Sequence, residues 1–271
     1  MTSRMKSTPI TRNPGKVFLV GAGPGDVELL TLKAARLLAA ADVVLVDDLA
    51  GDEVLSLCPN ARVVYVGKRG GCKSTPQAFI EKLLVREALA GHTVVRLKGG
   101  DVSLFGRSSE EMAALEAAGI EFEIVPGVTA GIAAAAELRA SLTHRDHAHA
   151  VAFITAHGAE GAEIPWQSLA QSALTLVVYM GVARATSLQQ SLLDGGLPGS
   201  TPVIAVENAS RPSARNVCAT VATMSHEFAA QSLKSPAILV IGEAMAERAA
   251  QLAIQAVNAE DSVAAPKRVL A

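Results

Sequence analysis

Short apolar runs rich in valine, isoleucine and leucine alternate along the chain with longer Ala- and Leu-rich stretches. Short β-branched runs predict strands, and their alternation with helical stretches is typical of an α/β chain with largely parallel strands. The predicted strands are 17–20, 43–46, 63–66, 94–97, 122–125, 151–155, 174–179, 202–206 and 237–241.

The helical stretches show apolar positions on one face. In "LLTLKAARLLAAA", residues 29–41, the positions Leu30, Ala34, Leu37, Leu38 and Ala41 recur at helical spacing, so we expect this helix to pack on a sheet. Further helices are predicted at 109–118, 130–139, 183–193 and 244–256.

A natural seam lies at "VPGVTAG", residues 125–131, where a strand ends in Pro-Gly and a helix begins at Thr129. With 271 residues, the chain is long enough for two α/β units. We therefore predict an N-terminal α/β domain at 16–126 and a C-terminal α/β domain at 127–258. Each is built around a mostly parallel sheet, and flexible tails at 1–15 and 259–271 flank them.

Unusual residues follow the carboxyl ends of the predicted strands. Open α/β sheets bind ligands in the crevice outside those ends, so the pattern predicts one cleft built from both halves of the chain. The segments are 21–26, Asp47, Lys68, 99–101, 126–130, Met180 and 207–209.

The first of these segments, "GAGPGD" at 21–26, differs from a dinucleotide fingerprint. Asp26 stands where G-x-G-x-x-G has its third glycine, and an acid at that position repels phosphate. The segment favours a phosphate-poor ligand or, alternatively, a plain turn that Asp26 caps. In "KGGD", Gly99 and Gly100 let the backbone approach a ligand, and Asp101 could bind a cation or a hydroxyl pair; a glycine turn capped by Asp101 is the alternative.

Composition narrows the classes of partner. A net charge of -2 and 3% aromatic residues argue against nucleic acid and anionic membranes. No apolar run approaches the ~20 residues that span a bilayer, and "MTSRMKSTPITRNPGK" has no apolar signal region, so we expect a soluble, cytoplasmic protein. Cys58, Cys72 and Cys218 form no C-x-x-C pair, so neither a metal site nor a disulfide is expected.

Eleven segments occur in order from about Val17 to Glu243, and together they resemble the tetrapyrrole methylase family. They are "VGAGPGD", "LLTLKA", "ADVVLVDD", "VGKRGG", "VVRLKGGD", "FGR", "VPGVTA", "LTHRD", "YMG", "VENA" and "SPAILVIGE".

This resemblance implies a two-domain α/β enzyme, usually a homodimer, that binds S-adenosylmethionine in the cleft between its domains. In the branch that it matches best, such enzymes methylate uroporphyrinogen III at C2 and C7 and release precorrin-2 for sirohaem, cobalamin or haem d1 synthesis. S-Adenosylmethionine carries no phosphate, as Asp26 leads us to expect. By position, the resemblance assigns cofactor contacts to Pro24, Gly100, Asp101, Val102, Thr129, Ala130, Met180, Ala209 and Ala237.

The resemblance also implies catalytic roles for Asp47 as proton acceptor and Lys68 as proton donor. Methyl transfer to a pyrrole carbon leaves a positive ring nitrogen that must lose a proton, so a nearby base is useful. Taken alone, a strand-end acid and a surface lysine are the plainer interpretations, and Met180 would be a core residue. For the eight substrate carboxylates, the candidates are Arg69, Arg107, Arg145 and His144.

The chain departs from the common family pattern at several positions, which bear on substrate affinity and regiochemistry. Three other functions stay open. These are methylation of another precorrin, a noncatalytic cofactor-binding module, and a nicotinamide oxidoreductase, which Asp26 opposes. The departures are Val46, Asp48, Val102, Ser108, Ser109 and His147.

Overall fold

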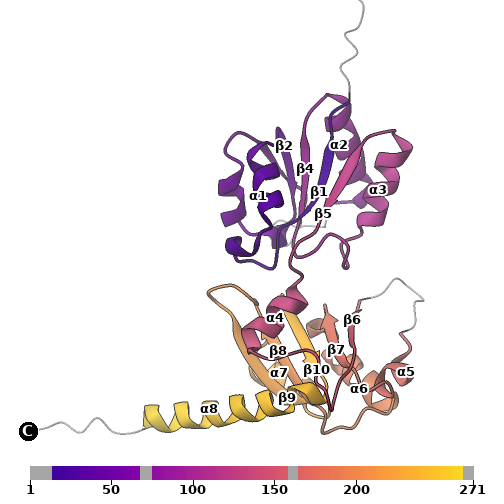
Figure 1. Ribbon diagram of the computed structural model, residues 1–271. Coiled ribbons are helices and arrows are strands. Elements are labelled where there is room, and N and C mark those ends of the chain that lie inside the picture. Colours follow the sequence, from indigo (N-terminus) through magenta and orange to yellow (C-terminus); the bar gives the residue numbers. More distant parts are fainter. Residues whose placement is uncertain (1–13, 68–74, 158–163, 265–271) are drawn as a thin grey trace, which may run out of the picture. The chain divides into compact units, whose positions relative to one another are not determined.

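The computed structural model describes residues 14–67, 75–157 and 164–264. The chain divides into two compact units between Thr129 and Ala130, inside the 125–131 segment. Each unit contains one five-stranded sheet with helices packed on it (Figure 1). The prediction of a two-unit α/β fold is confirmed.

All strand pairs of the N-terminal sheet are parallel, in the order β3-β2-β4-β1-β5. The inner strands β1, β2 and β4 are apolar along most of their length because helices cover both faces of the sheet. The strands are β1 Val17–Gly21, β2 Val43–Val46, β3 Arg62–Tyr65, β4 Val94–Lys98 and β5 Phe122–Val125.

Helix α1 (Leu32–Ala39) lies on one face of this sheet, as the apolar spacing predicts: Ala34 and Leu38 are fully buried among the side chains of β2 and β4. Helices α2 (Gln77–Leu89) and α3 (Ser108–Ala117) cover the opposite face. Three short 3-10 helices complete the unit: η1 Val27–Leu29, η2 Asp48–Ala50 and η3 Glu53–Leu57.

The C-terminal sheet has the order β6-β7-β10-β8-β9. Only its β6–β7 pair is parallel, so the prediction of a mostly parallel sheet is wrong for this unit. The strands are β6 Val151–Thr155, β7 Thr175–Tyr179, β8 Pro202–Glu207, β9 Arg215–Thr220 and β10 Ala237–Ile241.

The physical reason is a short hairpin. Strand β9, which the sequence analysis does not predict, returns directly beside β8, and α7 then carries the chain to β10 in the same reversed direction. The sequence of β9, "RNVCAT", has few β-branched residues because it lies at the sheet edge, where burial is partial.

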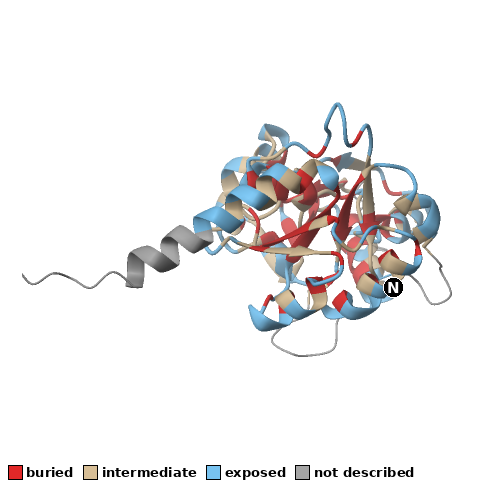
Figure 2. Cartoon of the chain, turned by 90° about the horizontal axis from the view of Figure 1, so that it is seen from below, coloured by how far each residue is buried: buried red, intermediate tan, exposed pale blue. Residues whose placement is uncertain are grey.

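Helices cover both faces of this second sheet as well. Helices α5, α6 and α7 lie on one face, and α4 and α8 on the other. Figure 2 shows that buried residues follow the strands while exposed residues lie on the outer helical surfaces. The elements are α4 Ala130–Leu138, α5 Trp166–Ala170, η4 Val182–Arg184, α6 Ala185–Asp194, α7 Met224–Ala230, η5 Glu243–Met245 and α8 Ala246–Ala264.

Helix α8 continues through residues 259–264, which the sequence analysis leaves in the C-terminal tail. The stretch "AEDSVAA" contains neither glycine nor proline, and Pro266 is the first residue that opposes a helix.

Candidate functional site

In the N-terminal unit, three backbone segments meet beyond the carboxyl ends of β1, β4 and β5. Gly23 and Gly100 form an isolated antiparallel bridge, with Gly100 N–H donating to Gly23 O at 2.7 Å and Gly23 N–H donating to Gly100 O at 3.2 Å. A Cβ at Gly21 would lie 2.7 Å from Gly100 O, and one at Gly127 would overlap the same oxygen. These glycines are required because the three backbones are in direct contact.

Asp101 joins two of these segments. Its Oδ1 accepts from Ser103 N–H at 2.8 Å, and its Oδ2 accepts from Gly127 N–H at 2.9 Å. Asp101 therefore caps the turn after β4, which is the alternative role given to it above. Its carboxylate also holds the segment after β5 against the segment after β4. Each oxygen keeps a further lone pair for a ligand.

Asp26 caps η1, since its Oδ1 accepts from Glu28 N–H at 2.8 Å. The first donors of this short helix thus face a carboxylate rather than an open position for phosphate. Pro24, the neighbouring predicted contact, is partly exposed in the same turn.

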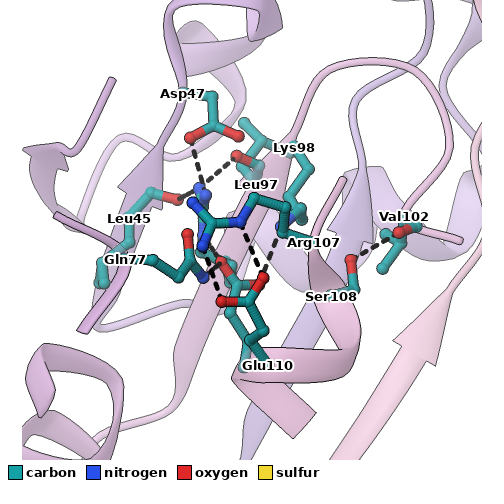
Figure 3. Close-up of polar contacts among 11 residues, drawn as sticks. Leu45, Asp47, Gln77, Leu97, Lys98, Val102, Arg107, Ser108 and Glu110 are labelled. Atoms are coloured by element: carbon teal, nitrogen blue, oxygen red, sulfur yellow. Dashed lines mark hydrogen bonds and ion pairs between the residues drawn. The ribbon is translucent and has the colours of Figure 1, made fainter. Parts of the chain in front are cut away.

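Asp47 follows β2 and is bonded to a buried cation. Arg96 Nη2 donates to Asp47 Oδ1 at 2.7 Å (Figure 3). The Asp47 side chain is 29% exposed, whereas that of Arg96 is 3% exposed. Arg96 also donates from Nε to Glu111 Oε1 at 2.9 Å, and Lys98 Nζ donates to Glu111 Oε2 at 2.9 Å. The four side chains form a balanced set of two positive and two negative charges, which we call the Asp47 ion network.

Burial, followed by the nearby charge of Arg96, lowers the pKa of Lys98 below its usual value, even though Glu111 opposes the shift. Arg96, Lys98 and Glu111 were not predicted from the sequence as site residues. A signal was present: positions 96 and 98 share one face of a central strand whose other residues are apolar, and charged residues are almost never fully buried unless paired.

Two of the residues at which this chain departs from the family pattern contact each other. Ser108 Oγ donates to the Val102 carbonyl at 2.5 Å, and both residues are buried. Val102 packs in the core under α2 and α3, so this predicted cofactor residue presents its side chain to the core. Asp48, a third departure, lies against the backbone of Gly67.

Arg107 lies at the start of α3 with a left-handed φ of 54°. Its Nε and Nη2 donate to the two carboxylate oxygens of Glu110, each at 2.7 Å. Its guanidinium is 62% exposed, and Arg107 also lines a cavity of about 330 Å³ together with Phe105, Met112 and Ile124. Any other carboxylate that approaches this guanidinium therefore has to compete with Glu110.

In the C-terminal unit, the reversed direction of β10 gathers the remaining predicted cofactor residues. Ala237 begins β10 and pairs with Glu207 at the end of β8, while Ile238 pairs with Tyr179 at the end of β7. Met180 and Ala209 follow those two strand ends. Three of the predicted positions thus lie at one edge of the sheet although β10 runs the opposite way.

Met180 is 47% exposed and has a left-handed φ of 56°, so the core interpretation of this residue is wrong. Ala209 and Ala237 are buried at 7% and 8% exposure, and they can offer a ligand mainly their backbone. The start of α4, next to Ala130, reaches the same edge because Gly131 N–H donates to Tyr179 Oη at 2.8 Å. Thr129 is the residue before α4 and the last of the N-terminal unit.

His144 and Arg145 lie in an exposed turn closed by a bridge between His144 and Ala148. His144 Nδ1 accepts from Asp146 N–H at 3.1 Å, and its ring lies 4.6 Å from that of His147. The other two predicted residues, Lys68 and Arg69, lie outside the described residues.

Glu207 holds the loop before β10. It accepts from Lys234 N–H at 2.9 Å and from Arg215 Nη2 at 2.7 Å. Arg215 in turn donates to the carbonyls of Gln231 and Ser232. Burial alone would raise the pKa of Glu207, but the Lys234 N–H and Arg215 outweigh it, so this pKa lies below its usual value.

Replacing Glu207 with glutamine is expected to lower the free energy of unfolding by about 1–3 kcal/mol at neutral pH, because a buried charge-assisted contact is lost. The pKa is lower in the folded chain than the unfolded value of 4.5, so this contribution is fully present above that pH. It is lost as the pH falls through the folded pKa. Urea unfolding at a series of pH values should therefore show a gap between wild type and variant that narrows in acid. Glu247→Gln, on the exposed side of α8, is the control; a gap for Glu207→Gln that stays constant with pH contradicts the assignment.

The residues that the structure describes contain no cluster of three or more His, Cys, Asp or Glu side chains that could hold a metal ion. No helix among them is long and apolar enough to cross a membrane.

Comparisons with known proteins identify the family of this chain. Residues 16–225, which include most of the N-terminal unit and a large part of the C-terminal unit, match the model of the tetrapyrrole (corrin/porphyrin) methylases. A uroporphyrinogen-III C-methyltransferase of Pseudomonas aeruginosa is 52% identical over 229 residues, covering 84% of this chain and 94% of the relative. A siroheme synthase of Chromobacterium violaceum is 47% identical over 84% of this chain, which is 49% of the relative's length. The crystal structure of a uroporphyrin-III C-methyl transferase from Thermus thermophilus, complexed with S-adenyl homocysteine, is 42% identical, with a TM-score of 0.75 over 85% of this chain and 93% of that one.

Proposed function

Because this chain belongs to the tetrapyrrole (corrin/porphyrin) methylases, we propose that it is an S-adenosylmethionine-dependent C-methyltransferase acting on uroporphyrinogen III. It adds methyl groups at C2 and C7 and releases precorrin-2, a precursor of sirohaem, cobalamin and haem d1. The observation that carries this proposal is the 52% identity to a methyltransferase of this specificity over nearly that relative's whole length.

The strand-end residues fit S-adenosylmethionine. Asp26 disfavours a phosphate-bearing ligand at the first turn, and the Gly23–Gly100 bridge brings bare backbone to the same edge. In the other unit, Ala209 and Ala237 are small and buried, and Met180 at the same edge of the sheet is exposed. When bound, the cofactor supplies an electrophilic methyl group on a sulfonium. The proposed contacts are those of Pro24, Gly100, Asp101, Val102, Thr129, Ala130, Met180, Ala209 and Ala237.

Asp47 is the proposed proton acceptor. A pyrrole carbon that takes a methyl group leaves a positive charge on the ring nitrogen, and a carboxylate beside that nitrogen stabilises the charge and removes the proton. Asp47 suits this role because it is partly exposed at a strand end and is paired on its buried side with Arg96. Lys68 remains the proposed proton donor. Most of the rate enhancement comes from holding the ring carbon in line with the methyl group.

The test is anaerobic incubation of the protein with S-adenosylmethionine and enzymatically generated uroporphyrinogen III, followed by mass analysis of the tetrapyrrole. A gain of two methyl groups supports the proposal, and a gain of one points to the region of Asp48, Val102 and Ser108 as limiting the second transfer. If the cofactor binds but no methyl group is gained, the substrate is another precorrin or the chain is a noncatalytic binding module.

Arg107 is proposed to bind a substrate carboxylate, together with Arg69, Arg145 and His144. Replacing Arg107 with alanine should raise KM for uroporphyrinogen III about two- to fivefold and leave kcat unchanged, because the side chain is largely exposed. Glu110→Gln should lower KM, since it releases the guanidinium from its internal partner. Initial rates over a range of substrate concentrations measure both effects; if KM stays at its wild-type value in both variants, Arg107 does not bind the substrate.

We also propose that the protein works as a cytoplasmic homodimer. The described cysteines, Cys58 and Cys218, are free thiols, as suits a reducing compartment. Light scattering coupled to gel filtration measures the oligomeric state directly.

A further inference from the structure

We propose that Arg96 is a positioning residue for Asp47 and that Glu111 holds Arg96 in place. The inference rests on the proposed function, since it concerns how the proposed proton acceptor is aimed. It assigns a role to two buried residues that are not among the proposed contacts of the substrate or the cofactor.

Each of the three guanidinium nitrogens of Arg96 donates at least one hydrogen bond. Nε donates to Glu111 Oε1 at 2.9 Å, and Nη2 donates to Asp47 Oδ1 at 2.7 Å. Nη1 donates to the carbonyls of Leu45 and Leu97 at 3.4 and 3.1 Å. All three nitrogens of a rigid plane are therefore engaged, so the direction of the Nη2–H bond is set by the strands β2 and β4 and by α3.

Glu111 is the buried carboxylate that holds Arg96 in place. Its side chain is fully buried, and its two oxygens are divided between Arg96 and Lys98, with Gln77 Nε2 donating to Oε1 at 3.3 Å. In Figure 3, dashed lines mark these contacts: Gln77 and Lys98 donate to Glu111, and Asp47 accepts from Arg96. A buried carboxylate with this many donors cannot move without leaving charges unpaired.

The placement argues for a functional role beyond stability. A buried ion pair can usually be replaced by apolar residues without loss of stability, so stability alone does not explain charges in a central strand. Asp47 is the member of the Asp47 ion network that reaches the solvent-facing strand end. An arginine does not give up its proton, so the network orients the carboxylate and does not conduct protons.

The same unit contains a second buried carboxylate that offers a control. Glu87 is 6% exposed and pairs with Arg62 at 2.6 Å and Arg86 at 2.7 Å. Arg62 begins β3, so this cluster lies at the amino ends of the parallel strands, whereas Asp47 follows the carboxyl end of β2. Glu87→Gln therefore removes the charge of a buried carboxylate, paired with arginines that are 53% and 69% exposed, at the opposite edge of the sheet.

The experiment is a double-mutant cycle with Arg96→Lys and Asp47→Asn. Lysine keeps the charge, but one nitrogen cannot contact Asp47, Glu111 and the two carbonyls together. Misplacing a catalytic group costs up to about 100-fold, so Arg96→Lys should lower kcat by roughly 10- to 100-fold, with KM and cofactor affinity close to wild type. In the Asp47→Asn background the same change should have little further effect, because the carboxylate that it aims is absent.

Two outcomes would overturn the proposal: wild-type kcat in Arg96→Lys, or an equal loss in the presence and absence of the Asp47 carboxylate. The control must separate positioning from general loosening. Glu87→Gln is expected to lower the unfolding midpoint and keep kcat; a loss of kcat as large as that of Arg96→Lys would also overturn the proposal.

If Arg96→Lys does not fold, Glu111→Gln replaces it in the cycle. This variant keeps an oxygen for Arg96 Nε but removes a buried charge, and it should lower kcat in the same Asp47-dependent way. If the wild type transfers no methyl group to uroporphyrinogen III, the proposed function fails separately. The urea unfolding midpoint is then measured for both single variants and for the double variant. A loss in the double variant that differs from the sum of the two single losses supports the contact, and a loss equal to that sum overturns it.

Discussion

Asparagine in place of Asp47 is expected to reduce kcat for methylation of uroporphyrinogen III by about 10²- to 10⁴-fold, the contribution typical of a general base. The side-chain amide oxygen can still accept from Arg96, so the fold should be retained, but it cannot take up a proton at neutral pH. Cofactor affinity should stay near the wild-type value, because Asp47 is not among the proposed cofactor contacts. Single-turnover methyl transfer and equilibrium binding of S-adenosylmethionine measure the two effects separately.

Asp42 provides a matched control for this variant. It precedes β2 as Asp47 follows it, and its Oδ2 accepts from Thr93 N–H at 2.8 Å. The two aspartates thus lie at opposite ends of one strand, each with a hydrogen-bond partner. Asp42→Asn should leave kcat unchanged. Full activity in Asp47→Asn would remove Asp47 from the mechanism, and an equal loss in both variants would show that the effect is structural.

Replacing Gly127 with alanine is expected to abolish tight binding of S-adenosylmethionine and to destabilise the N-terminal unit by about 1–3 kcal/mol, the usual cost of overpacking. The added Cβ would overlap the Gly100 carbonyl oxygen and lie 2.9 Å from Gly21 Cα, and both neighbours are backbone atoms that cannot rotate away. The loops after β1, β4 and β5 must then separate, which also breaks the Asp101 contact to Gly127 N–H. Calorimetric titration with the cofactor and urea unfolding measure the two losses.

Gly119→Ala is the control for Gly127→Ala. Gly119 has a positive φ of 65° but open space around it, so alanine there costs stability through backbone conformation alone. We expect cofactor binding to survive in that variant. Cofactor affinity close to wild type in Gly127→Ala would mean that the contact of the three backbones is not needed for binding.

The local sequence was sufficient to predict most strands and the helix that packs on the first sheet, because short β-branched runs and helical spacing reflect burial directly. The missed strand β9 shows the limit of this reasoning. "RNVCAT" is an edge strand, and its pairing with β8 comes from a hairpin that local propensity does not reveal. Strand direction was wrong in the second sheet for the same reason.

The candidate site divides in a similar way. Asp47, Asp101 and Met180 could be selected from the sequence because each follows an apolar run, and strand ends collect functional residues in α/β sheets. Arg96, Lys98 and Glu111 were missed, although two charges on one face of an apolar strand were visible. Their partners lie on α3 and β2, and which side chains meet across a sheet depends on packing.

The order of apolar and polar residues therefore decides the class of fold, the number of units and the positions of the strand ends, since these follow from which residues leave water. Only the tertiary structure decides that β10 is antiparallel to β7 and β8, which places Ala237 beside the ends of those two strands. It likewise decides that Arg96 contacts Asp47, 49 positions away in the sequence, and that the Arg107 guanidinium is paired with the Glu110 carboxylate. Contacts of this kind depend on strand order, register and helix placement, which arise from the packing of segments distant in the chain.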